Sequence, residues 1–136
     1  MTDTAKPLPA ITPLSKPFWD AAGAGRLAVQ HCDDCGMLRF PPLPRCDICG
    51  NERTSWVTLS GRGSIWAKCE FHRAYLPGFA AELPYNVVLI ALEEGPRLYS
   101  NLVGTAFADI VLVTEVVAVF VPATDAVTLV KFRLAG

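Results

Sequence analysis

The second half of the chain alternates apolar and polar residues with the period of β-strands. Residues 64–73 give the clearest run, because every second position is apolar. This alternation predicts a strand with one face on the core and the other toward solvent. The expected inward residues are Ile65, Ala67, Cys69 and Phe71, and the expected outward residues are Trp66, Lys68, Glu70 and His72.

Four further strands are predicted, at residues 85–92, 97–103, 110–121 and 126–134. Turns rich in glycine, proline and acidic residues separate most of them. Five antiparallel strands with glycine bends and no long helix favour a small closed or partly open barrel of the OB type. A β-sandwich is the alternative.

The first 60 residues follow a different pattern. Residues 1–12 lack apolar periodicity and are expected to form a flexible leader. A short helix is predicted to begin at Ser15, with Pro17 in its first turn, and to end at Gly23. We therefore expect a mainly β protein, with a leader (1–12), a helix and rubredoxin-like zinc ribbon (13–60), and a five-stranded OB-fold domain (61–136).

Two adjacent aromatic residues, Phe18 and Trp19, lie on the predicted helix. They cannot both face the same way on so short an element. We expect one to anchor the helix while the other faces a partner or ligand, with packing of both against the rest of the protein as the alternative.

Two Cys-x-x-Cys-Gly sequences, which we call the two knuckles, form the strongest motif in the chain. Their spacing lets two thiolates in each sequence point at one ion, so that four soft ligands complete a tetrahedral zinc site. The glycine after each second cysteine can adopt the positive φ of a tight turn. The predicted zinc ligands are Cys32, Cys35, Cys46 and Cys49.

Paired cysteines can also bind iron, act as a redox dithiol or form disulfides. Iron in a rubredoxin-like site would use the same four ligands and stays open. A redox dithiol is disfavoured because no βαβ pattern accompanies it, and disulfides would require an oxidising compartment. A closed four-cysteine site has no open position for substrate, so we expect it to contribute folding energy and not catalysis. His31 is expected to lie outside it, and a Cys69–His72 catalytic dyad is geometrically poor.

Composition and charge narrow the function classes. Residues with apolar side chains make up 51% of the chain, which suggests an exposed apolar surface that meets a partner or ligand. The formal net charge is −1 and the basic residues are scattered, so nucleic-acid binding is disfavoured. No apolar run reaches the length of a membrane span, because Glu115 and Asp125 interrupt the best candidate. We expect a cytoplasmic protein.

Several short motifs occur in an order that resembles the zinc-ribbon OB-fold family known as domain of unknown function 35, and the resemblance covers residues 13–134. The motifs are the Phe-Trp helix, a Gly-x-Leu strand, two knuckles joined by Arg39-Phe40-Pro41-Pro42, Gly61-x-Gly63, Leu76-Pro77-Gly78-Phe79, and Glu94-Gly95-Pro96-Arg97 followed by Asn101-Leu102-Val103-Gly104. The chain departs from the family at residues 110–117, where members often have a glycine turn.

The resemblance implies an accessory subunit of acyl-CoA metabolism. Members pair with thiolase-like enzymes, including lipid-transfer-protein-type thiolases and steroid side-chain aldolases, or with acyl-CoA hydratases. We therefore expect a hetero-oligomer, without catalysis by this chain alone. A stand-alone acyl-CoA-binding module and a single-stranded nucleic-acid-binding protein are the alternatives. The candidate acyl-CoA or partner surface, basic at one end and aromatic at the other, comprises Arg39, Phe40, Trp66, Lys68, His72, Arg73, Tyr75 and Phe79.

Overall fold

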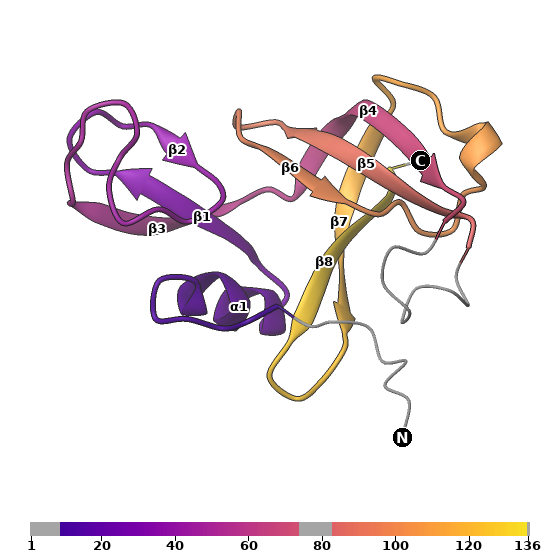
Figure 1. The fold of residues 1–136 in the computed structure, drawn as a ribbon. Coiled ribbons are helices and arrows are strands. Elements are labelled where there is room, and N and C mark those ends of the chain that lie inside the picture. Colours follow the sequence, from indigo (N-terminus) through magenta and orange to yellow (C-terminus); the bar gives the residue numbers. More distant parts are fainter. Residues whose placement is uncertain (1–8, 74–82, 136) are drawn as a thin grey trace.

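The computed structural model describes residues 9–73 and 83–135, and it folds them into one helix and two antiparallel sheets (Figure 1). A small three-stranded sheet lies at one end of the molecule, and a curled five-stranded sheet lies at the other. Most of the expected leader falls outside the described residues. Within the described part of the chain, no helix is long and apolar enough to cross a membrane.

Helix α1 (Lys16–Gly23) begins and ends where the sequence predicts. Ser15 occupies the N-cap position, but its hydroxyl makes no capping bond and instead pairs with Thr12. Phe18 is buried in the core, together with the alanines of the last turn. The helix thereby packs on β1 and on the two C-terminal strands, and joins the ribbon to the larger sheet.

The small sheet has the strand order β2–β1–β3. Its strands are β1 (Leu27–Cys32), β2 (Leu38–Arg39) and β3 (Thr54–Leu59). Strand β3 was not predicted, although its β-branched and aromatic residues are those that strands favour. It pairs with β1 along its whole length, from Leu27 opposite Leu59 to Cys32 opposite Thr54. Strand β1 is therefore hydrogen-bonded to a neighbouring strand on each side, and the first knuckle begins at its end.

The large sheet is a curled, five-stranded half-barrel of the OB type, as predicted. Its order is β6–β5–β4–β7–β8, and a parallel bridge between Leu102 and Phe132 brings the two outer strands together. The strands are β4 (Arg62–Phe71), β5 (Tyr85–Leu92), β6 (Arg97–Ser100), β7 (Glu115–Pro122) and β8 (Thr128–Leu134), with a 3₁₀ helix η2 (Phe107–Asp109) before β7.

A β-bulge in β4 changes which side chains face the core. Ile65 pairs with Ile90, but Ala67 pairs with Leu89, so the strand gains one residue at Trp66. An extra residue moves every later side chain to the opposite face. The prediction that Cys69 is buried is therefore wrong, and Cys69 is exposed. The prediction that Lys68 points outward is wrong for the same reason, because Lys68 pairs with the fully buried Val88.

One continuous apolar core serves both sheets. Phe132, Ile65 and Ile90 are completely buried in the half-barrel, and they belong to the same cluster as Leu27 and Val29 of the ribbon strand β1. The ribbon is therefore packed against the half-barrel and is held by apolar contacts as well as by its cysteines.

Candidate metal centre and the adjoining surface

The two Cys-x-x-Cys-Gly sequences fold into two turns with the same hydrogen bonds. In the first knuckle the Gly36 N–H donates to the Cys32 carbonyl at 2.9 Å, and in the second the Gly50 N–H donates to the Cys46 carbonyl at 2.9 Å. Both glycines have positive φ, at 78° and 75°, as the sequence predicted. Each turn thus aims its two sulfur atoms to the same side.

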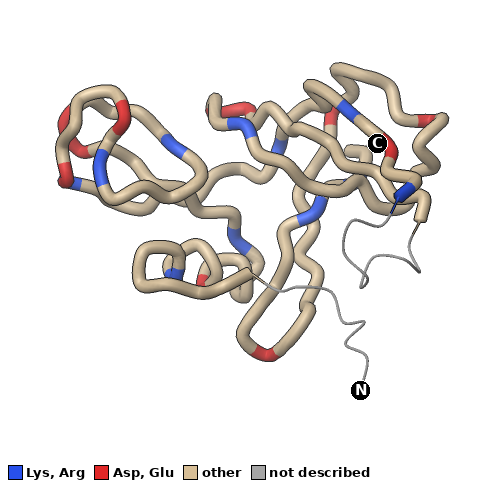
Figure 2. Tube along the Cα trace, in the orientation of Figure 1, with Lys and Arg blue, Asp and Glu red and all other residues tan. Residues whose placement is uncertain are grey.

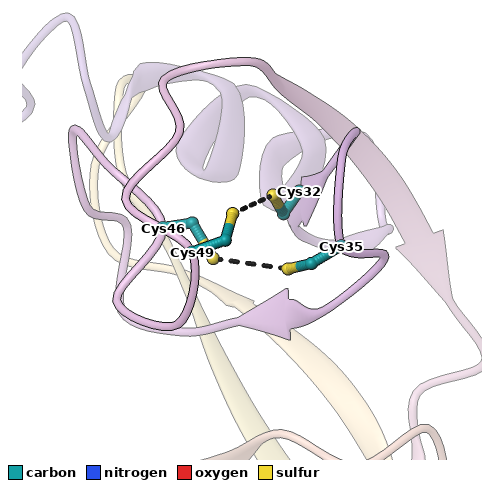
Figure 3. Close-up of side chains that lie close together, drawn as sticks. All are labelled: Cys32, Cys35, Cys46 and Cys49. Carbon is teal, nitrogen blue, oxygen red and sulfur yellow. Dashed lines mark hydrogen bonds between the residues drawn. The ribbon is translucent and has the colours of Figure 1, made fainter.

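The four sulfur atoms converge from the two knuckles (Figure 3). All lie within 4.8 Å of one another, with 3.5 Å between Cys32 and Cys49 and 3.6 Å between Cys35 and Cys46. A tetrahedral zinc ion with Zn–S bonds of about 2.3 Å would place its sulfurs about 3.8 Å apart. The donor set and its spacing are consistent with one structural zinc ion, and within residues 9–73 and 83–135 no other group of metal-ligating side chains is found.

Backbone donors favour the thiolate form of the first cysteine in each knuckle. The Cys49 and Ile48 N–H groups lower the pKa of Cys46 to about 6. The Cys35 N–H, followed by that of Asp34, likewise lowers the pKa of Cys32. Hydrogen bonds to a sulfur stabilise its charged form, as expected for a metal ligand.

The second cysteine of each knuckle has a raised pKa. At Cys35 the Met37 N–H favours the thiolate, but burial and the neighbouring sulfurs outweigh it and raise the pKa to about 12. At Cys49 the Asn51 N–H acts in the same way and is likewise outweighed. A bound dication would remove this conflict, because it favours the thiolate at all four positions.

His31 does not belong to the sulfur cluster, as predicted. Its Nδ1 lies 3.3 Å from an Asp33 carboxylate oxygen. The Ser55 hydroxyl donates to that same oxygen at 2.6 Å. The hydrogen bond from Ser55 lowers the pKa of Asp33, followed in effect by the one from His31. This small network joins β1 to β3 beside the first knuckle.

Arg39 is buried against residues 40–44, which we call the proline loop, with only 6% of its surface exposed. Its Nη2 donates to Thr54 Oγ1 at 2.6 Å and to the Leu43 carbonyl at 3.3 Å, whereas Nε and Nη1 have no partner. Arg39 thus connects β2, the loop and β3, and is not part of the open surface. Gln30, which is also buried, accepts the Leu43 N–H at 2.8 Å and holds the same loop.

An apolar groove of about 430 Å³ runs between α1, the proline loop and the outer strands of the half-barrel. Phe40, the next residue of the predicted surface, lines it, and its ring centroid lies 5.2 Å from that of Phe18. Phe18 and Trp19 also line the groove; Phe18 is buried in the core, and the partly buried Trp19 packs against the same core. Both aromatics therefore pack on the protein, and a contact of Trp19 with a partner or ligand stays a prediction. Lys131 is the one charged side chain among the described lining residues.

The next described residues of the predicted surface, Trp66, Lys68 and His72, do not line this groove. Trp66 is 54% exposed, and the Arg97 guanidinium lies 4.1 Å from its ring centroid. Lys68 lies elsewhere, because its Nζ donates to the Ile110 carbonyl at 2.6 Å and sits 4.6 Å from the Phe107 ring centroid. His72 pairs with Glu70 at 3.0 Å.

Three further residues complete the predicted set. Arg73 is exposed at the end of the described segment, and Tyr75 and Phe79 lie outside the described residues. Binding of acyl-CoA by the residues of the predicted surface stays a prediction. Sequence reasoning missed Tyr99 and Lys131, because only the folded chain brings β6 and β8 beside α1.

Two family models match consecutive parts of the chain. The rubredoxin-like zinc ribbon domain of ChsH2 matches residues 19–55, and the C-terminal OB-fold domain of ChsH2 matches residues 56–121. The solved structure of the Ltp2-ChsH2(DUF35) aldolase contains a similar chain, with 37% identity and a TM-score of 0.85 over 95% of this chain and 100% of that one.

Curated relatives include subunits of acyl-CoA enzymes. A probable enoyl-CoA hydratase alpha subunit of Thermomonospora curvata is 38% identical over 94% of this chain and 40% of its own length. The 3-oxo-4,17-pregnadiene-20-carboxyl-CoA hydratase alpha subunit of Mycobacterium tuberculosis is 32% identical over 79% of this chain and 34% of its own length. The benzoylsuccinyl-CoA thiolase subunit BbsA of Thauera aromatica is 31% identical over 71% of this chain and 67% of its own length. The chain thus spans less than half the length of the two hydratase relatives.

Proposed function

This chain belongs to the ChsH2 (DUF35) family of zinc-ribbon and OB-fold subunits, and we propose that it binds and stabilises a thiolase-like or acyl-CoA hydratase partner. The similarity to the whole ChsH2(DUF35) chain of an Ltp2 aldolase carries the proposal most directly. The thiolase subunit among its relatives points to the same class of partner.

The chemistry of the fold supports a scaffolding role for this chain. Its metal centre has four protein ligands, so a bound zinc would have no open position for water or substrate. When bound, the zinc would supply a cross-link between the two knuckles. The first knuckle is continuous with β1, and β1 packs against α1, so the cross-link would hold the proline loop and the helix in place beside the half-barrel.

The apolar groove supports a further role in holding acyl-CoA. Its volume lies within the range of small-molecule sites, and its walls are aromatic and aliphatic, as an acyl chain requires. Lys131 at the groove supplies one positive charge for the anionic part of such a ligand. We propose that the acyl group contacts Phe40 and Trp19, with or without a partner enzyme.

Nucleic-acid binding is the weaker candidate, although OB-folds and zinc ribbons serve it elsewhere. Figure 2 shows Lys and Arg scattered over both sheets, without a continuous basic stripe along the described chain. Phosphate backbones require such clustered positive charge. Binding to single strands that weakens steeply with salt would favour this alternative.

The partner role is tested by co-expressing the chain with the thiolase-like or hydratase protein encoded beside it. The two proteins should co-elute, and Cys46→Ser should reduce the yield of complex. The matched Cys69→Ser variant should not, because Cys69 lies outside the metal cluster. If the two wild-type proteins elute separately, and the activity and solubility of the enzyme are unchanged, the proposed function is wrong.

The acyl-CoA role is tested separately by calorimetry with butyryl-CoA, octanoyl-CoA and free CoA. The groove predicts tighter binding of the longer chain, and Trp19→Ala should weaken it. Absence of heat with all three at two well-separated temperatures, both for this chain and for the complex, would rule out direct binding, because apolar burial changes the heat capacity and cannot be silent at both.

A further inference from the structure

Three consecutive large apolar residues lie exposed between η2 and β7. Val111 is 64% exposed, Leu112 47% and Val113 77%, and we call these three residues the apolar tip. They lie on the loop that runs from η2 back to the start of β7, beside the first half of β4 (Figure 1). Single exposed apolar residues are common on protein surfaces, but a contiguous group of this kind marks a contact site more often.

Hydrogen bonds hold the apolar tip in one conformation. The Val113 N–H donates to the Ile65 carbonyl at 2.7 Å, and the Ile65 N–H donates to the Thr114 carbonyl at 3.1 Å. On the other side, Ile110 is buried and its carbonyl accepts the Lys68 ammonium at 2.6 Å. The tip is therefore pre-organised, which lowers the entropy lost on binding.

The backbone of Val113 is strained, and its side chain gains no burial in return. Its φ is +68°, and among the described residues it is the one non-glycine with positive φ. A β-branched side chain in this conformation is rare and costly, whereas glycine would adopt it freely. Because the Val113 side chain is mostly exposed, packing within the protein does not offset this cost. Strain of this kind points to a role outside the fold.

Charge distinguishes between a protein partner and a lipid surface. The exposed side chains of Asp109 and Glu115 flank the tip, and the sequence contains no Lys or Arg between Arg97 and Lys131. Membrane-inserting apolar segments use basic neighbours to bind anionic lipids, whereas the residues that flank this tip along the chain are acidic. The exposed Arg62 lines the same cavity as Glu115. The nearby Lys68 is engaged with the Ile110 carbonyl and the Phe107 ring.

We propose that the apolar tip docks into an apolar pocket with a neutral or basic rim on the thiolase-like partner subunit. This inference rests on the proposed function and adds the surface through which the partner is held. The side chains of Val111, Leu112 and Val113 enter the pocket, while Asp109 and Glu115 face its rim. A glycine at position 113 would adopt the same backbone conformation without strain, but it would have no side chain to fill the pocket. Val113 supplies that side chain.

The test measures affinity for an immobilised thiolase-like protein from the same organism, together with the melting temperature of each variant. The double variant V111S/L112S should bind at least tenfold more weakly, since two buried apolar side chains are removed. V113G should melt a few degrees higher yet bind more weakly, because it removes both the strain and the side chain. The control V121S removes another exposed valine, on β7, and should leave the affinity unchanged.

The possible failures can be told apart. Equal binding of the wild type and V111S/L112S overturns the tip proposal alone, whereas failure of the wild type to bind overturns the proposed function and the tip proposal together. Binding of the wild type to phosphatidylglycerol vesicles that is lost in V111S/L112S would also overturn the tip proposal, in favour of a lipid surface. A V113G variant that melts lower than the wild type would show that Val113 serves the fold.

Discussion

Removing the metal should unfold the two knuckles while the half-barrel stays folded. The metal cross-links the chain between Cys32 and Cys49, which closes a loop of about 18 residues, and the chain-entropy relation for such a loop gives about 3 kcal/mol. The half-barrel keeps its own buried residues, such as Ile65 and Phe132, and does not contribute a ligand to the cluster. The expected result is therefore local opening and not global unfolding.

Hydrogen exchange measures this opening at defined atoms. The Cys32, Gly36, Cys46 and Gly50 amides each donate to a carbonyl at 2.9 Å around the two knuckles. A loss of about 3 kcal/mol corresponds to exchange that is faster by roughly 100-fold. Amides in the β4–β5 and β7–β8 ladders should exchange at their former rates.

The assay compares metal-loaded protein, chelated protein kept reduced, and two serine variants. Cys46→Ser removes a ligand and should reproduce the effect of the chelator, whereas Cys69→Ser makes the same chemical change at an exposed thiol outside the cluster. Metal analysis of the loaded protein should give one zinc ion per chain, and a coloured protein with iron would identify the other metal. Unchanged knuckle exchange after chelation, or equal behaviour of the two variants, would refute the reasoning.

Three further predictions concern packing and reactivity. Gly63→Ala should cost about 2 kcal/mol or more in chemical denaturation, because its Cβ would lie 2.7 Å from the Ala91 carbonyl oxygen; a cost below 0.5 kcal/mol would contradict this close approach. Phe132→Ala should cost about 3–5 kcal/mol by the same measurement, since this side chain is completely buried where β8 meets the segment after β6, and a near-neutral effect would place the core elsewhere. Thiol titration of the zinc-loaded protein should label Cys69 rapidly and the four ligands slowly; protection of Cys69 would restore its predicted burial.

The metal centre was predictable because its determinants are local. Two residues between cysteines and a following glycine define each knuckle whatever surrounds it, and Gly36 and Gly50 adopt the positive φ that this pattern requires. Four strands of the half-barrel were predictable for a related reason, since turn residues and alternation bound them, whereas β7 begins at Glu115 and not at residue 110 as predicted. Strand β3 was predictable in principle from its β-branched and aromatic residues, but was overlooked.

The candidate surface was less predictable because it depends on register and on distant contacts. Strict alternation placed Trp66 and Lys68 on one face, and the bulge beside Ile65 separates them. No local sequence pattern predicts such a bulge, because its position depends on how the strand pairs with its two neighbouring strands. The groove, likewise, exists only where Trp19 and Phe40 meet Tyr99 and Lys131 from strands far along the chain.

The central claim, that this chain acts by completing a partner enzyme, is tested most directly by titrating it into the isolated thiolase-like protein and measuring acyl-CoA turnover. The account predicts that turnover and melting temperature of the partner rise to a plateau at a fixed ratio of the two chains. It also predicts that metal-depleted chain reaches that plateau only at higher concentration, and that the chain alone turns over nothing. Turnover by the chain alone, or a partner whose activity and stability stay constant throughout the titration, would contradict it.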